Sequence, residues 1–135
     1  MIKKIMVVDD SFVMRTLIKD ILSADPELQV VGEAANGTEA LEKVKELQPD
    51  VMLLDIEMPG MDGIECLKRL KLVSACKVVI VSSVAQLGST QSVEARKLGV
   101  IDVISKPSGA LSLDLKAKKG SDIVKISRRA AGLPE

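Results

Sequence analysis

Short runs of aliphatic residues recur along the chain, separated by segments long enough to hold a helix. They occupy residues 5–8, 28–31, 51–54, 78–81 and 100–104, the second being the weakest and the last being interrupted by Asp102. Three of these runs are continuously apolar rather than alternating, which is typical of strands covered on both faces within a parallel sheet. The pattern therefore predicts five strands, most of them buried on both sides.

The intervening segments have the spacing of amphipathic helices. Residues 13–22, 40–47, 64–71 and 93–98 carry apolar side chains three or four positions apart, and a thinner apolar face follows Leu113. Asn36 precedes the second helix as a capping residue, and Gly99 follows the fourth. Five strands alternating with five helices predict an α/β fold, a doubly wound (βα)₅ sandwich around a parallel sheet.

In a sheet of this kind, ligands bind beyond the carboxyl ends of the strands. The residues at those ends are Asp9 and Asp10, Asp55, Ser82 and Ser83, and Lys106 followed by Pro107. Neighbouring strands lie about 4.8 Å apart, so three carboxylates gathered there would repel one another. A divalent cation relieves that repulsion, and Mg²⁺ is suited by carboxylates together with phosphate oxygens and water. The hydroxyl and the ammonium are the partners that phosphoryl oxygens need.

Each of these short motifs is ordinary by itself. An Asp-Asp pair is common in solvated turns, a serine often ends a strand, and a Lys-Pro pair after a strand covers an edge. Their joint placement favours a functional site, because each motif falls at the carboxyl end of a predicted strand.

Composition narrows the chemistry further. The chain has 135 residues, the size of one domain, and its 47% apolar and 28% charged residues are typical of a globular protein. It contains 19 basic residues, 19 acidic residues and one aromatic residue, Phe12, so neither a basic surface nor aromatic stacking indicates nucleic-acid binding. Because the sequence contains no histidine, it has neither a Ser-His-Asp triad nor an imidazole metal site.

The remaining composition bears on the cellular compartment. Cys66 and Cys76 form no Cys-x-x-Cys pair, so we expect buried or half-buried thiols rather than a disulfide framework. No apolar run approaches the ~18 residues of a membrane span, and the first run is too short for a signal peptide. We therefore expect a soluble, cytoplasmic protein without membrane insertion.

Taken together, the motifs resemble those of the response-regulator receiver family. The matching segments are Val7-Val8-Asp9-Asp10-Ser11, Leu53-Leu54-Asp55-Ile56-Glu57-Met58-Pro59-Gly60-Met61-Asp62-Gly63, Val81-Ser82-Ser83 and Ser105-Lys106-Pro107. They occur in the family's order and near its spacing, over about residues 1–110. The resemblance implies a flavodoxin-like fold with the strand order 2-1-3-4-5.

The resemblance also implies roles for the acidic residues. Asp55 is expected to accept a phosphoryl group from a phosphohistidine on a separate histidine kinase. Asp10 and Asp55 are expected to ligate Mg²⁺ directly, and Asp9 mainly through water. The backbone carbonyl of Glu57 is expected to complete the metal's shell.

The residues of the fourth and fifth strand ends are expected to respond to the phosphoryl group. Lys106 is expected to pair with the acyl phosphate, and Ser82 to move as a switch whose hydroxyl bonds the phosphoryl oxygens. Ser83 and Pro107 lie beside these two residues. Receivers often carry an aromatic residue three positions before the lysine, and Val103 stands there, so the resemblance does not extend to an aromatic switch.

The segment after the Lys-Pro motif narrows the resemblance. It is Ser108-Gly109-Ala110-Leu111-Ser112-Leu113-Asp114-Leu115, and together with the Asp55 and Ser82 motifs it resembles the receiver of chemotaxis protein-glutamate methylesterases. The alternative is a generic loop leading into the last helix. The resemblance implies a receiver core at residues 1–115, with the last helix and the start of an interdomain linker at residues 116–135.

It further implies two partners. One is a histidine kinase of the chemotaxis type, which donates the phosphoryl group, and the other is a methylesterase domain that follows the receiver in the parent protein. The resemblance implies that such methylesterase domains use a Ser-His-Asp triad, whereas the 135 residues of this sequence include no histidine. We therefore do not expect this chain to hydrolyse a methyl ester itself.

Other classes of function fit part of the sequence. One is the receiver of a different response regulator, such as a transcription factor or a single-domain protein. Another is a metal-dependent phosphatase with an aspartyl nucleophile, although Asp55-Ile56-Glu57 lacks the Asp-x-Asp pair that such enzymes use. A third is an interaction module with a vestigial pocket. A nucleotide-binding fold is disfavoured because neither G-x-G-x-x-G nor G-x-x-x-x-G-K occurs.

Overall fold

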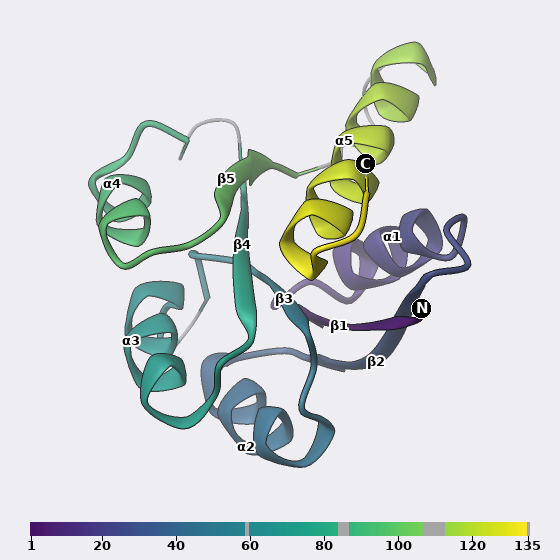
Figure 1. The fold of residues 1–135 in the computed structure, drawn as a ribbon. Helices are drawn as coiled ribbons and strands as arrows, with labels where there is room; N and C mark the ends of the chain where they lie inside the picture. The colour runs from purple at the N-terminus through teal and green to yellow at the C-terminus, as the bar shows by residue number, and fades with distance from the viewer. Residues whose placement is uncertain (59, 84–86, 107–112, 135) are drawn as a thin grey trace.

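Five parallel strands form one sheet in the part of the chain that the computed structural model describes, residues 1–58, 60–83, 87–106 and 113–134. The strands are β1 Lys3–Val8, β2 Leu28–Ala34, β3 Val51–Leu54, β4 Lys77–Ser82 and β5 Asp102–Ser105. Their order across the sheet is β2-β1-β3-β4-β5 (Figure 1). The predicted α/β fold and its strand order are therefore confirmed.

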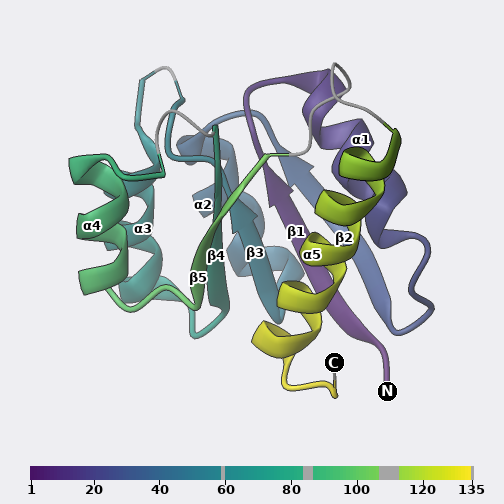
Figure 2. The same ribbon diagram turned by 90° about the horizontal axis from the view of Figure 1, so that it is seen from above.

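A helix follows each strand, and the helices cover both faces of the sheet. They are α1 Phe12–Leu22, α2 Gly37–Leu47, α3 Gly63–Val73, α4 Thr90–Lys97 and α5 Leu113–Ala131. Figure 2 shows α1 and α5 on one face, with α2, α3 and α4 on the other. The predicted capping signals are in place: the Asn36 side chain accepts a hydrogen bond from the N–H of Glu39, and Gly99 follows α4 with a φ of 91°.

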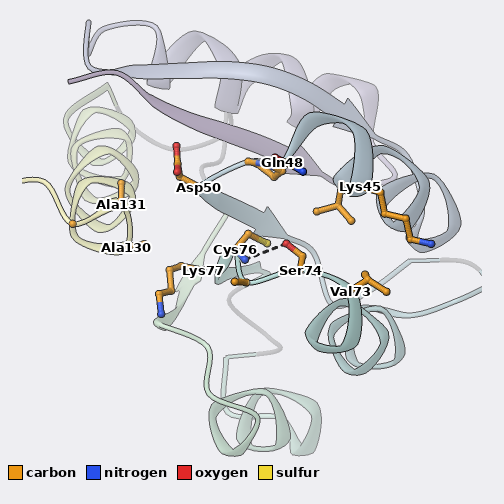
Figure 3. Close-up of a pocket in the computed structure, with 13 residues that line it drawn as sticks. Lys45, Gln48, Asp50, Val73, Ser74, Cys76, Lys77, Ala130 and Ala131 are labelled. Carbon is orange, nitrogen blue, oxygen red and sulfur yellow. Dashed lines mark hydrogen bonds between the residues drawn. The ribbon is translucent and has the colours of Figure 1, made fainter.

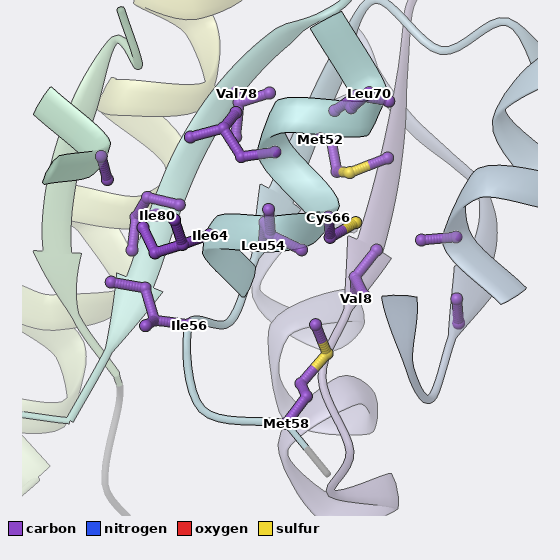
Figure 4. Packing of buried hydrophobic residues seen from close by; sticks show 14 of the residues in the cluster. Val8, Met52, Leu54, Ile56, Met58, Ile64, Cys66, Leu70, Val78 and Ile80 are labelled. Carbon is purple, nitrogen blue, oxygen red and sulfur yellow. The ribbon is translucent and has the colours of Figure 1, made fainter. Parts of the chain in front are cut away.

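A hydrophobic cluster lies on each face of the sheet, because successive strand side chains point to opposite sides. Met52 and Leu54 belong to the cluster under α2 and α3 (Figure 4). Val51 and Leu53 of the same strand belong to the opposite cluster, with Ile123 of α5. This double coverage explains why the central strands are continuously apolar.

Both cysteines are free thiols associated with the core, as expected from the sequence. Cys66 of α3 is fully buried, and Cys76 just before β4 is half-buried. Burial raises the pKa of the Cys66 thiol to about 11. The thiol therefore stays protonated at neutral pH and packs as a small apolar side chain.

The strand β2 is longer than its apolar run. The run predicted an end at residue 31, whereas the strand continues to Ala34. Glu33 breaks the apolar pattern of this segment, but its carboxylate pairs with Arg15 and Lys19 of α1. A charge that α1 neutralises is thus accommodated within the strand.

The strand β5 is shifted toward the carboxyl end relative to its apolar run. It covers Asp102–Ser105 rather than residues 100–104. The N–H of Ile101 donates a 2.8 Å hydrogen bond to the carbonyl of Val78, in the approach that follows the turn at Gly99. The first two residues of the run therefore lead into the strand instead of forming part of it.

The second half of α5 is fastened to the rest of the fold. Ile123 and Ile126 are buried in the core. The Arg128 guanidinium pairs with Asp25 at 2.8 Å and with Glu27 at 3.0 Å, which joins the end of α5 to the α1–β2 loop. Among the described helices, none combines the length and the apolar character that crossing a bilayer requires.

Candidate functional site

The side chains predicted at the strand ends lie together at one edge of the sheet. Asp9 and Asp10 follow β1, Asp55 follows β3, Ser82 is the last residue of β4, and Lys106 follows β5. These four strands are consecutive parallel neighbours, so their carboxyl ends meet. Carboxylate oxygens of Asp9, Asp10 and Asp55 lie within 4.8 Å of one another. The sheet thus gathers the three acidic residues into one cluster.

Asp9 and Asp55 are held in the same way. The Oδ1 atom of each accepts a hydrogen bond from the backbone N–H two residues further on, from Ser11 at 2.9 Å and from Glu57 at 3.1 Å. Such Asx turns fix a carboxylate against its own backbone. The Oδ2 atoms face Lys106, whose Nζ lies 3.2 Å from Asp9 and 3.1 Å from Asp55. One ammonium therefore bridges carboxylates from two strands.

This acidic cluster is buried, and burial shifts its proton equilibria. Asp9 and Asp55 are each 1% exposed. Burial raises the pKa of Asp55 to about 6, and the charge of Asp9 adds to the rise while Lys106 opposes it. Burial also raises the pKa of Asp9. Burial alone would lower the pKa of Lys106, but attraction to Asp55 and Asp9 outweighs this and raises it.

Several buried oxygens of the site lack a hydrogen-bond partner in the described chain. They are Oδ2 of Asp9, Oδ2 of Asp55 and Oγ of Ser82. The two carboxylate oxygens still form close ion pairs with Lys106. Buried polar atoms without partners are uncommon in folded proteins and indicate a bound ion or other ligand. A set of carboxylate oxygens fits a hard cation such as Mg²⁺.

The two serines at the end of β4 have different surroundings. Ser82 is fully buried, and its carbonyl accepts a 2.7 Å hydrogen bond from the backbone N–H of Lys106. Ser83 is half-buried, and its hydroxyl donates a 3.1 Å hydrogen bond to the Glu57 carboxylate. This bond joins the end of β4 to the loop after Asp55. Nothing in the sequence indicated it, because the two residues belong to separate loops.

Of two further predicted residues, one lies away from the acidic cluster and the other lies outside the described residues. Val103 is 6% exposed and packs in the hydrophobic cluster beside α3 and α4. The position where receivers often carry an aromatic residue is thus filled by a buried aliphatic side chain. Pro107 lies outside the described residues, so its place beside Lys106 stays a prediction.

Sequence reasoning missed Arg15. Its guanidinium donates a 2.7 Å hydrogen bond to the backbone carbonyl of Asp9 and a 2.8 Å hydrogen bond to the Glu33 carboxylate. The helical spacing of α1 gave no signal for this contact, because an arginine on such a helix is usually solvated. Its partner Glu33 comes from a segment of β2 that the apolar pattern did not include.

An open groove of about 660 Å³ lies at the opposite edge of the sheet (Figure 3). Asp50 and Lys77, which precede or begin β3 and β4, line it together with Ala130 of α5. Within it, the Ser74 hydroxyl accepts a 3.1 Å hydrogen bond from the N–H of Cys76. The groove lacks the clustered carboxylates that lie at the carboxyl ends of the strands. The edge at those carboxyl ends is therefore the candidate functional site.

Comparison with known families agrees with this geometry. Residues 5–118 match the family model described as the response regulator receiver domain. The chain belongs to this family. The receiver resemblance of the strand-end motifs is thereby confirmed, and the acidic edge described above corresponds to the place where those motifs converge.

Relatives of the receiver are similarly informative. This chain is 50% identical over 124 residues to the protein-glutamate methylesterase/protein-glutamine glutaminase 1 of Syntrophomonas wolfei. The match covers 92% of this chain and 35% of the relative. A protein-glutamate methylesterase/protein-glutamine glutaminase of Halalkalibacterium halodurans is also 50% identical over 124 residues, with 92% and 36% covered. The chain thus spans about a third of the length of these curated relatives.

Solved structures show the same fold. The response regulator domain of Thermotoga maritima CheB matches with a TM-score of 0.84 and 40% identity, over 100% of both chains. A chain from the complex of the CheA3 P1 domain with CheY6 of R. sphaeroides matches with a TM-score of 0.79 and 40% identity, over 96% of this chain and 97% of that one. The flavodoxin-like receiver architecture is therefore shared with these two solved structures.

Proposed function

We propose that this receiver accepts a phosphoryl group on Asp55 from a histidine kinase of the chemotaxis type, and thereby regulates a methylesterase domain in its parent protein. The observation that carries the proposal is the buried Asp55 carboxylate, whose Oδ2 lies 3.1 Å from Lys106 and has no hydrogen-bond partner in the described chain. A carboxylate fixed by its backbone at one oxygen, with an ammonium beside the other, is suited to act as a nucleophile.

The chemistry follows from the surrounding residues. The Oδ2 atom of Asp55 attacks phosphorus, the phosphorus–nitrogen bond of phosphohistidine breaks, and its electron pair stays on the imidazole. The turn at Glu57 holds the carboxylate in place during the attack. Lys106 neutralises charge on the phosphoryl oxygens from the position it already occupies between Asp55 and Asp9. Positioning and charge neutralisation are the main requirements of phosphoryl transfer.

We assign the cation site to Asp9, Asp10 and Asp55, with the backbone carbonyl of Glu57 as a further ligand. A bound Mg²⁺ would neutralise the carboxylates and polarise the phosphoryl oxygens. Support comes from the clustered carboxylate oxygens and from the orphaned Oδ2 atoms of Asp9 and Asp55. Asp10 is exposed, so it faces the side from which a cation and a phosphodonor enter.

We further propose that Ser82 reports the phosphorylation. Its hydroxyl is fully buried and has no hydrogen-bond partner among the described residues, so it gains a hydrogen bond when phosphoryl oxygens appear at Asp55. Because the backbone of Lys106 is bonded to the Ser82 carbonyl, movement at one strand end reaches the other. Phosphorylation then biases β4, β5 and their helices between two arrangements.

The parent protein is proposed from the relatives, which are methylesterases of about three times this length. In it, we expect residues 1–115 together with the rest of α5, which packs into the core, to form the receiver, and the linker to the methylesterase domain to start after Ala131. Phosphorylation would relieve the block that the receiver places on that domain. The chemotaxis kinase as phosphodonor, and a cytoplasmic location for both, belong to the same proposal.

The central test is phosphorylation of this chain by a small acyl phosphate with Mg²⁺, followed by intact-mass measurement. We expect the mass of one phosphoryl group to be added. This group should not be added when Mg²⁺ is chelated before the reaction, nor in Asp55→Asn. Asp20→Asn, at an exposed acid of α1, is the matched control and should be phosphorylated normally. A phosphoryl group that persists in Asp55→Asn would contradict the proposal. Sustained turnover of a phosphate monoester would favour the phosphatase alternative.

A further inference from the structure

The junction between β1 and α1 is fixed by a side chain that carries no predicted role. The Arg15 guanidinium donates from one terminal nitrogen to the Asp9 carbonyl at 2.7 Å, and from Nε to Oε1 of Glu33 at 2.8 Å. Its fork therefore spans the end of β1 and the adjacent strand β2. Arginine is suited to this because its planar donors serve two acceptors at once.

The Asp9 carbonyl depends on this contact. The N–H of Asp9 continues the pairing of β1 with β2 by donating to Ala34 at 3.1 Å. Its carbonyl leaves that ladder, and no backbone N–H of the described chain donates to it. Arg15 supplies the partner, and so sets the orientation of the peptide that joins Asp9 to Asp10.

Asp10 makes that orientation important. Its carboxylate belongs to the acidic cluster, yet it forms no hydrogen bond or ion pair with the described parts of the chain. No described side chain pairs with it, unlike Asp9 and Asp55, whose carboxylates contact Lys106. The position of Asp10 is therefore determined by its backbone, and the preceding peptide is the one that Arg15 anchors.

Arg15 is itself held firmly. Its side chain is only 12% exposed, and Glu33, its partner, is also paired with Lys19. Lys43 of α2 donates a 2.6 Å hydrogen bond to the carbonyl of the same glutamate. The Phe12 ring lies 5.7 Å from the Arg15 guanidinium carbon. This surrounding network fixes the arginine before any ligand binds.

We infer that Arg15 is a positioning residue for the cation site: by holding the Asp9 carbonyl, it places the Asp10 carboxylate where Asp9 and Asp55 complete the site. The inference rests on the proposed function, since it assumes that this cluster binds Mg²⁺. Residues that orient metal ligands without touching the metal commonly affect affinity by tenfold or more. The pair formed by Arg15 and Glu33 fits that role.

The test compares Arg15→Met with Arg128→Met. Arg128 is a matched control because its guanidinium also bridges two acceptors, Asp25 and Glu27, and its side chain is 17% exposed. It lies near the end of α5, in contact with the α1–β2 loop rather than with the acidic cluster. The measured quantities are the Mg²⁺ dissociation constant, from calorimetry or amide chemical shifts, and the urea midpoint of unfolding.

We expect both variants to lower the urea midpoint, but only Arg15→Met to weaken Mg²⁺ binding, by about tenfold. An unchanged Mg²⁺ affinity in folded Arg15→Met would overturn the inference, as would equal weakening in both variants. If the unaltered chain binds no Mg²⁺, the proposed function fails together with the inference. If it binds Mg²⁺ and Arg15→Met binds equally well, the inference alone fails.

Glu33→Gln provides a second test in case Arg15→Met does not fold. Glutamine keeps an oxygen for the Arg15 Nε but removes the charge that holds the guanidinium. We expect a smaller weakening of Mg²⁺ binding in the same direction. Unchanged affinity in this variant, with Arg15→Met unfolded, would overturn the role of the Arg15–Glu33 pair.

Discussion

The ammonium of Lys106 lies 3.1 Å from Oδ2 of Asp55, at the ends of two strands that are not neighbours in the sheet. It lies 3.2 Å from Asp9 as well, so one ammonium pairs with two buried carboxylates and offsets only part of their charge. Removing Lys106 would leave two buried carboxylates without a compensating charge, which costs more than the ion pairs contribute. The predicted behaviour of the site depends on this arrangement.

Replacing Lys106 by methionine should destabilise the metal-free protein at pH 7 by about 3 kcal/mol, because Asp9 and Asp55 are left buried and unpaired. The loss of stability should be smaller near pH 5, because Asp55 takes up a proton there. Its pKa is already about 6, and removing the Lys106 charge raises it further. Urea unfolding of the wild type and the variant at both pH values measures this.

Lys68→Met is the control for the removal of an ammonium. Lys68 pairs with Glu94 at 3.1 Å, but both side chains are largely solvated. Exposed ion pairs contribute little to stability, so this variant should unfold nearly as the wild type does. Equal losses in the two variants would show that burial of the Lys106 contacts has no energetic consequence.

Asp55→Asn should stabilise the metal-free protein at pH 7. In the wild type the folded-state pKa of Asp55 is about 6, above its ordinary value, so the folded state binds this proton more tightly than the unfolded chain does. Stability therefore falls as pH rises from about 4 to 6, and the penalty is fully present above this window. At 1.36 kcal/mol per pKa unit, the gain in the variant is on the order of 2–3 kcal/mol.

Unfolding curves in the presence of a chelator, taken from pH 4 to pH 7.5, check this. The difference in free energy of unfolding between Asp55→Asn and the wild type should grow with pH and then level off. Added Mg²⁺ should stabilise the wild type more than the variant, because binding to the folded state alone adds stability. A difference that stays constant with pH would contradict the raised pKa.

Gly63→Ala should disturb the segment that carries Asp55. A Cβ at residue 63 would lie 2.4 Å from the Asp55 carbonyl oxygen and 2.5 Å from the Ile56 Cα, and backbone atoms cannot move aside cheaply. We expect a loss of 1–3 kcal/mol or more, as for other overpacked sites, together with slower phosphorylation.

Gly88→Ala is the matched control, since a Cβ there meets no atom of the described residues within 4 Å. It should leave stability unchanged or raise it slightly by restricting the unfolded chain. Thermal unfolding and the rate of phosphorylation by a small acyl phosphate distinguish the two variants. A Gly63→Ala protein as stable as Gly88→Ala would show that the α3 start does not press on the Asp55 backbone.

The sheet was predictable because its central strands carry a signal that depends on no partner. Val51–Leu54 is buried on both faces and is apolar throughout. The end of β2 was not predictable, because Glu33 is tolerated there by charges on α1 that lie 14 and 18 residues away in the sequence. A local pattern cannot report such a pairing.

The same distinction holds at the site. The convergence of Asp9, Asp55 and Lys106 follows from strand ends meeting at one edge, which topology alone requires. The contacts of Arg15 with the Asp9 carbonyl and of Ser83 with Glu57 depend on side-chain directions that no spacing rule supplies. The sequence pattern thus located the groups that converge at this edge and missed the contacts that orient them.

Ser82→Ala should stabilise the unphosphorylated protein by about 1 kcal/mol, because the buried hydroxyl that it removes has no hydrogen-bond partner in the described chain. Ser127→Ala is the matched control: its hydroxyl is equally buried and unpartnered, but it lies in α5. Both variants should raise the melting temperature and both should still be phosphorylated. Only Ser82→Ala should lose the chemical-shift changes that phosphorylation produces in β4 and β5, because its phosphoryl group meets a methyl group. Equal shift changes in the two variants would remove Ser82 from the switch.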